Sequence, residues 1–185
     1  MKNILVFIIS ISYLFCFPQN KSETYDFKKS NWGDYKYQVK KAEKLRSVSE
    51  NDNYIEYNSQ ISGIACTLTY IFTQGKLSAV KYRVSVEHEN NNHYLIDRDK
   101  LEDLLSRKYG KPTNYYENWI SPVYEDDPSA YGYAISIGHY SIYTQWKNQN
   151  TDIVLTLEGS GNIIDLTIKY ISKKYKELDK SAEDL

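Results

Sequence analysis

The chain has 185 residues and a formal charge of −1, with 23 basic and 24 acidic side chains interspersed along it. This balance gives no electrostatic basis for binding nucleic acid, which would require an excess of Lys and Arg. Its two cysteines stand at positions 16 and 66. A domain that follows position 16 therefore has one cysteine and no internal disulfide bond.

Residues 1–16 predict a signal peptide. Lys2 precedes an apolar run from Ile4 to Phe17, which is interrupted only by two serines. The run is shorter than the ~20 apolar residues of a membrane-spanning helix, and its charged start is typical of a secretory signal. We therefore expect an exported protein, periplasmic, secreted or on the cell surface, with no transmembrane span in the mature chain.

Two fates remain open for Cys16: it is a lipid attachment site, or it is the last residue removed. A bacterial lipoprotein signal normally has a small residue before its cysteine, whereas the bulky Phe15 occupies that position here, and this favours ordinary cleavage. Membrane association is expected only if Cys16 is lipidated, and one acyl chain anchors weakly. Residues 17–30 are expected to form a tether.

The first part of the predicted domain combines a short helix with strands. Asp34 is placed to cap a helix, and a brief strand is expected over 54–57. Apolar residues alternate with polar ones over 63–72 and again over 77–86, the pattern of half-buried strands. The turn around Gly75 joins these two segments into a hairpin.

The second part repeats this succession. A leucine stripe predicts a helix from Asp97 to Tyr109, which Gly110 and Pro112 end. After an aromatic connection, Asp127 followed by proline predicts the start of a short helix to about residue 137. Three further strands are expected, over 140–146, 152–157 and 163–171, with a charged tail over 173–185.

The sequence thus predicts an α+β fold, with the order helix, three strands, helix, three strands. We expect one domain over 31–172, in which an antiparallel sheet carries its helices on one face. The order also suggests half-repeats over 31–88 and 94–172. A sheet covered on one side leaves the other face free to bind a partner.

Trp32, Gly33 and Asp34 precede the first helix, and the second helix contains the pair Leu104 and Leu105 and is followed, after Tyr109, by Gly110, Lys111 and Pro112. This pattern resembles the superfamily that contains β-lactamase inhibitor protein and the small lipoprotein of the outer-membrane β-barrel assembly machinery. The whole chain also resembles uncharacterised exported bacterial proteins with a Trp-Gly helix start, a Lys-Tyr-Gly-Lys-Pro helix end and a late Trp. Either resemblance implies a non-enzymatic binding or assembly role and supplies no catalytic residue.

The reactive residues do not form a recognisable catalytic or metal motif. Cys66 alternates with apolar strand residues, which indicates a core cysteine and not a nucleophile. His88 and His93 are five positions apart, whereas a zincin motif needs two histidines at i and i+4. We therefore expect no metal ion and no cofactor.

The aromatic connection is the main candidate for a binding surface, because loops carry sites and aromatic residues dominate interface energetics. The expected partner is a protein or another component of the cell envelope. The alternative interpretation is that this segment folds back and plugs the sheet. The residues of the hypothesis are Tyr115, Tyr116, Trp119, Tyr124 and Tyr131.

An enzymatic alternative also remains open. Glu125 or Asp127 together with His139 could perform acid–base chemistry on an envelope polymer. A cleft that brings His139 within hydrogen-bonding reach of a carboxylate would favour this hydrolase. An exposed aromatic patch would favour binding.

Overall fold

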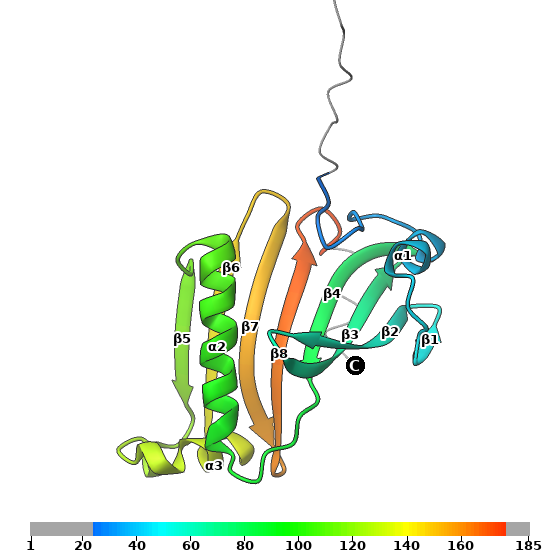
Figure 1. Ribbon diagram of the computed structural model, residues 1–185. Helices are drawn as coiled ribbons and strands as arrows, with labels where there is room; N and C mark the ends of the chain where they lie inside the picture. The colour runs from blue at the N-terminus through cyan, green and yellow to red at the C-terminus, as the bar shows by residue number, and fades with distance from the viewer. Residues whose placement is uncertain (1–23, 177–185) are drawn as a thin grey trace, which may run out of the picture.

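The computed structural model describes residues 24–176, which form an eight-stranded antiparallel sheet together with three α-helices (Figure 1). The expected signal peptide, Cys16 and the end of the charged tail lie outside these residues. The helices are α1 (Lys36–Glu43), α2 (Asn92–Tyr109) and α3 (Tyr131–Ser136), with the short 3₁₀ turns η1 (Pro122–Tyr124) and η2 (Pro128–Ala130). The strands are β1 (Ser49–Asn51), β2 (Tyr54–Ile61), β3 (Ile64–Thr73), β4 (Lys76–Val84), β5 (Asn114–Trp119), β6 (Tyr140–Lys147), β7 (Thr151–Ser160) and β8 (Ile163–Ser172).

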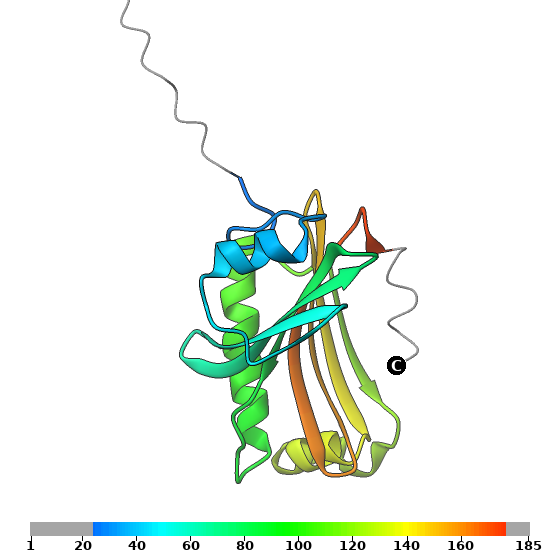
Figure 2. The same ribbon diagram turned by 90° about the vertical axis from the view of Figure 1, so that its right-hand side faces the viewer.

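The strands lie in the spatial order β1-β2-β3-β4-β8-β7-β6-β5. Each half of the sheet is a run of neighbouring strands, and the two halves join where β4 pairs with β8. The α+β class with an antiparallel sheet is confirmed. All the helices of residues 24–176 lie on one face, because the buried side chains of β3, β4, β8, β7 and β6 share that face. In Figure 2, α1 (blue) and α2 (green) stand on the same side of β6, β7 and β8.

The expected order of elements is wrong. Four strands follow α1, and α2 is followed by one strand, the short α3 and then three strands. The two halves therefore do not match as repeats. The missed strands are β1, which lies between the expected first helix and the expected strand over 54–57, and β5, which lies in the expected aromatic connection. All three residues of β1 are exposed, and so are the four central residues of β5, so neither strand shows the alternating burial by which strands are recognised.

Strands in the middle of the sheet follow the expected period closely. In β3 the even positions from Ile64 to Phe72 are buried and the odd positions are exposed or half-buried. Strand β2 continues to Ile61, beyond the expected end at residue 57, because its backbone stays paired with β3 up to Ile61 opposite Ile64. Backbone pairing thus extends a strand past the end of its apolar pattern.

Helix α2 buries Leu101 and Leu105 against the sheet. It begins five residues before the expected Asp97, and the Asn90 side chain accepts a hydrogen bond from the backbone N–H of Asn92 at 2.9 Å. The expected cap at Asp127 is confirmed, since its carboxylate accepts the backbone N–H of Ser129 at 3.0 Å. None of the helices within residues 24–176 combines the length and apolar character needed to cross a membrane.

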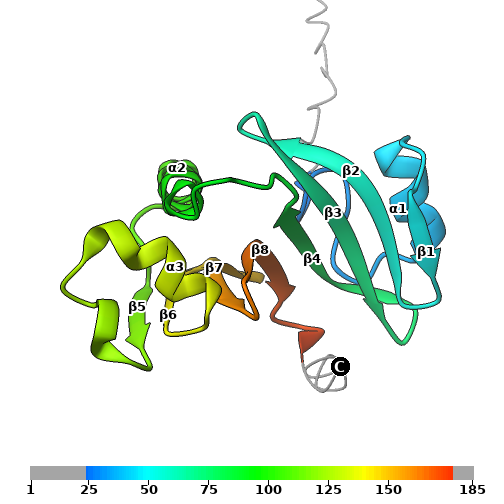
Figure 3. The same cartoon turned by 90° about the horizontal axis from the view of Figure 1, so that it is seen from below.

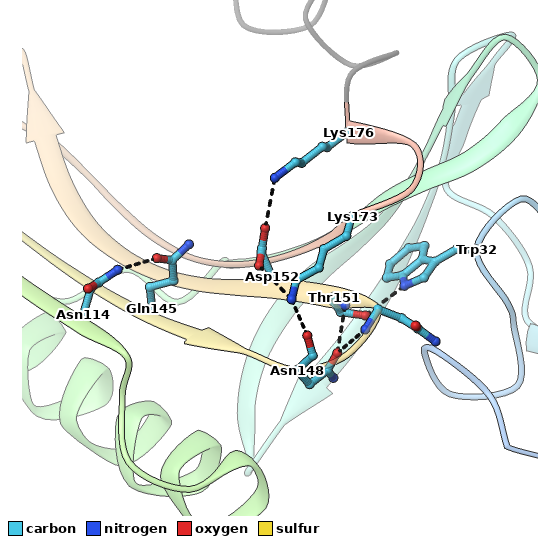
Figure 4. Close-up of polar contacts among 9 residues, drawn as sticks. Trp32, Asn114, Gln145, Asn148, Thr151, Asp152, Lys173 and Lys176 are labelled. Atoms are coloured by element: carbon cyan, nitrogen blue, oxygen red, sulfur yellow. Dashed lines mark hydrogen bonds and ion pairs between the residues drawn. The ribbon is translucent and has the colours of Figure 1, made fainter.

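Residues before position 31, expected to be tether, contribute to the fold. The buried Phe27 ring lies 5.0 Å from the ring of Tyr170 and 5.9 Å from that of Tyr82. The Trp32 indole N–H donates to Thr151 Oγ1 at 2.8 Å, at the start of β7 (Figure 4). The described N-terminal segment is therefore attached both to the core and to β7, in the second half of the sheet.

Candidate functional site

The aromatic connection begins as β5, the edge strand of the second half of the sheet. Strand β5 pairs with β6, and no other strand of the described chain lies beside it. Its two neighbouring tyrosines are both accessible, with 48% of Tyr115 and 58% of Tyr116 exposed. Because successive strand residues point to opposite faces, this edge presents one tyrosine on each face of the sheet.

Tyr115 lies on the helix-covered face, opposite the buried Thr144 of β6. Its ring is 5.4 Å from the guanidinium carbon of Arg98, and its hydroxyl donates to Glu117. Partial burial, with the Glu117 carboxylate beside it, raises the pKa of Tyr115 to about 12. Tyr115 is therefore neutral at physiological pH and offers a ring and a hydroxyl to a partner.

The guanidinium of Arg98 is itself almost fully buried between α2 and the sheet. It donates to Thr144 Oγ1 at 2.7 Å and pairs with Glu102 one turn further along α2. These contacts fix the cation under the ring of Tyr115. The helix-side wall of the edge is thus polar and rigidly held.

Tyr116 lies on the opposite face, which no helix of the described residues covers. Its ring is 6.0 Å from the ring of Tyr143, its partner on β6. Beside them, the Asn114 amide donates to Gln145 Oε1 at 2.8 Å, and Figure 4 shows this pair on the strands next to Asp152. Burial, followed by the Asp152 carboxylate, raises the pKa of Tyr143. The open face thus carries a neutral aromatic pair next to amide groups.

Asp152 lies near the start of β7, beside the β6–β7 turn. Its carboxylate is 3.8 Å from Lys173 Nζ and 3.6 Å from Lys176 Nζ, and its Oδ1 is buried without a hydrogen bond (Figure 4). Lys173 also donates to the backbone carbonyl of Asn148 at 2.5 Å. These contacts join the end of β8 to the β6–β7 turn, which is a structural role.

Trp119 and Tyr131 form an internal cluster. The Trp119 ring stacks on the buried Tyr140 at 4.0 Å between centroids and 8° between planes, and Tyr131 packs against both rings. The Tyr131 hydroxyl donates to the carbonyl of Glu125 at 2.8 Å. For these two residues the geometry matches the plug that we considered as the alternative to a binding surface.

Tyr124 is half-buried, with its ring 5.5 Å from Tyr133 and 6.2 Å from His139. Of the five residues in the binding hypothesis, Tyr115 and Tyr116 are therefore exposed, whereas Trp119, Tyr124 and Tyr131 are partly buried against other aromatic rings. Three exposed apolar residues that follow β5 were not among the five predicted binding residues. They are Ile120 (74% exposed), Val123 (70%) and Tyr133 (50%).

The described structure does not bring His139 to a carboxylate. His139 Nδ1 is buried without a hydrogen-bond partner, and the ring next to it is that of Tyr124. Asp127 Oδ1 is occupied by the backbone N–H and the hydroxyl of Ser129. The hydrolase alternative is thus left without a paired acid and base at this position.

The remaining reactive residues have structural surroundings. His88 Nε2 lies 2.8 Å from Asp97 Oδ2, and Lys100 lies 3.2 Å from the other oxygen of that carboxylate. Burial raises the pKa of the Cys66 thiol, which keeps it protonated. Within residues 24–176, no group of three or more His, Cys, Asp or Glu side chains is placed to hold a metal ion.

Comparison of the chain with models of protein families, with curated proteins and with solved structures gives no match. The resemblances noted in the sequence consequently stay predictions.

Proposed function

We propose that this chain is an exported, non-enzymatic binding or assembly protein of the bacterial cell envelope, and that it binds a protein partner along the free edge of β5. The observation that carries the proposal is that β5 has two exposed tyrosines and, within residues 24–176, no strand paired with its outer edge. The location is proposed from the apolar run of residues 4–17 and its charged start.

The two edges of the sheet are built differently. Strand β1 has three residues, and charged Glu50 and Asp52 lie within and directly after it. Short charged edges resist pairing with another chain. Strand β5 has six residues, of which only Glu117 is charged. This edge is thus the one suited to receive another strand.

An added strand would use the backbone groups of β5 that point away from β6. Ile120 donates its backbone N–H to His139, its neighbour across the β5–β6 ladder, at 2.8 Å. Backbone groups alternate in direction along an antiparallel strand, so the N–H groups of Tyr115 and Glu117 point outward. In β-strand addition these groups give affinity, and the flanking side chains give specificity.

The test is site-specific photo-cross-linking in the native host, with a benzophenone amino acid in place of Tyr116. The control carries the same amino acid in place of Tyr37 on α1, which is 68% exposed. We expect a discrete cross-linked protein from position 116 and none from position 37. Equal cross-linking from both positions would contradict the proposal.

A second variant tests the role of the backbone edge. Glu117→Pro removes an outward N–H and no bond to β6, a position where edge strands accept proline. We expect the cross-link from position 116 to disappear while the circular dichroism spectrum stays unchanged. Glu50→Pro, on the opposite edge, is the matched control and should leave the cross-link intact.

A further inference from the structure

A cavity of about 430 Å³ opens on the helix-covered face, away from β5. Pockets for small molecules typically measure about 300–1,000 Å³. Its walls come from α2, from the described N-terminal segment, and from β2, β4 and β8. In Figure 3, α2 and the turn of the β2–β3 hairpin lie above β8, and β4 joins β8 to this hairpin.

The interior of this cavity is mainly aromatic and aliphatic. Tyr82 and Tyr170, both more than nine-tenths buried, form the floor, and the Tyr109 ring lies 6.3 Å from that of Tyr170. Leu104 of α2 and Ile61 at the end of β2 are half-buried wall residues. Such a surface binds the apolar body of a ligand, and the tyrosine rings add stacking contacts.

Three charged residues line the cavity, Asp26, Lys28 and Lys108, and the first two have polar partners within the described chain. Lys28 is balanced by Glu43 at 3.2 Å, and the oxygens of Asp26 accept from the Trp32 backbone N–H and the Asn150 amide. Lys108 has no carboxylate partner in the described chain. Its Nζ lies 4.9 Å from the centre of the Tyr109 ring.

We infer that this cavity binds a small amphipathic anion, with its apolar part between Leu104, Ile61 and the tyrosine floor and its acidic group at Lys108. A hydrophobic hollow that has at its rim a lysine without a carboxylate partner among the described residues is complementary to this class of molecule, and the oxygens of Asp26 are already engaged by Trp32 and Asn150. The site is separate from β5, so it stands independently of the proposed function.

The experiment uses two fluorescent probes that differ in one group. 1-Anilinonaphthalene-8-sulfonate is anionic, and N-phenyl-1-naphthylamine is its neutral counterpart. We expect both to bind the folded protein with 1:1 stoichiometry and the sulfonate to bind more tightly. Lys108→Gln should lower the affinity for the sulfonate by about fivefold and leave the affinity for the neutral probe unchanged. Arg107→Gln, the neighbouring residue on α2, should change neither.

A large side chain placed in the cavity should weaken the binding of both probes. Leu104→Trp is expected to weaken each by about tenfold or more, whereas Ile96→Trp, at an exposed position of α2 outside the cavity, should have no effect. Ile61→Trp fills the cavity from the opposite wall and covers the case in which Leu104→Trp fails to fold. Unchanged affinities in both filled variants would overturn the site, and equal weakening of both probes by Lys108→Gln would overturn the anionic ligand. Glu117→Pro should leave probe binding intact, which separates this test from that of the proposed function.

Discussion

The two halves of the sheet have the same number of strands, but their helices are attached in different ways. Helix α1, over β1–β4, has eight residues and buries only Val39. Helix α2, over β6–β8, has eighteen residues and buries Leu101, Leu105 and the charged Asp97 and Arg98. Burial of several side chains therefore attaches α2 to the sheet, whereas α1 is also attached by polar surface contacts, such as the ion pair of Lys40 with Glu50 at 2.9 Å. Similar strand architecture does not imply similar anchoring of the helices.

The largest effects on stability are expected when the buried side chain that attaches each helix to the sheet is shortened. Leu105→Ala should lower the free energy of unfolding by about 3 kcal/mol, because it leaves a cavity under α2. Val39→Ala removes two methyl groups under α1 and should cost about 1.5 kcal/mol. Urea denaturation of both variants measures the difference. Equal losses would show that the two helices are anchored alike.

A smaller loss of stability is expected when a methyl group is added at the contact between α3 and α2. A Cβ at Gly132 would lie 2.4 Å from the backbone of Asn91 and Asn92, so Gly132→Ala forces the two helices apart. We expect a loss of about 2 kcal/mol. Gly75→Ala, in the β3–β4 turn of the first half, meets no atom within 4 Å, and its positive φ of 75° should cost about 1 kcal/mol. The two glycine-to-alanine substitutions thus compare a packing clash with backbone strain, and thermal unfolding of both variants measures the difference. A larger loss of stability for Gly75→Ala than for Gly132→Ala would show that the packing between α3 and α2 is loose.

The smallest effect concerns the surface pair of the first half. The hydrogen bond from Lys40 lowers the pKa of Glu50. Since the folded state favours the carboxylate, the pair contributes stability above the ordinary glutamate pKa and loses it as the pH falls through the lowered value. Lys40→Ala should return this pKa towards its ordinary value in an NMR titration, with almost no change in the free energy of unfolding. Lys41→Ala is the control, and a shift of the Glu50 pKa in that variant would contradict the assignment.

The sequence predicted the elements whose residues are buried on one side. The alternation in β3 and the leucine stripe of α2 leave a local pattern, because burial repeats at a regular spacing. The cap at Asp127 is a signal within three neighbouring residues. Strands β1 and β5 were missed because exposed edge strands show no such period. Their pairing is decided by β2 and β6 beside them.

The candidate site was predicted only as a segment. Tyr115, Tyr116, Trp119, Tyr124 and Tyr131 look equivalent in the sequence. The fold separates exposed Tyr115 and Tyr116 from Trp119, which stacks on Tyr140 twenty-one positions later. The segment also turns out to contain an edge strand, a feature that depends on the strand order of the whole sheet.

By itself, the sequence determined the α+β class, the central hairpin, the long helix and the core position of Cys66, since each depends on periodic burial or on signals within a few residues. Only the tertiary structure decided the union of the two halves through β4 and β8, the free edge at β5 and the aromatic cavity beside α2. These features join residues that lie far apart in the chain. Their formation depends on which surfaces become buried together, and no local pattern encodes that.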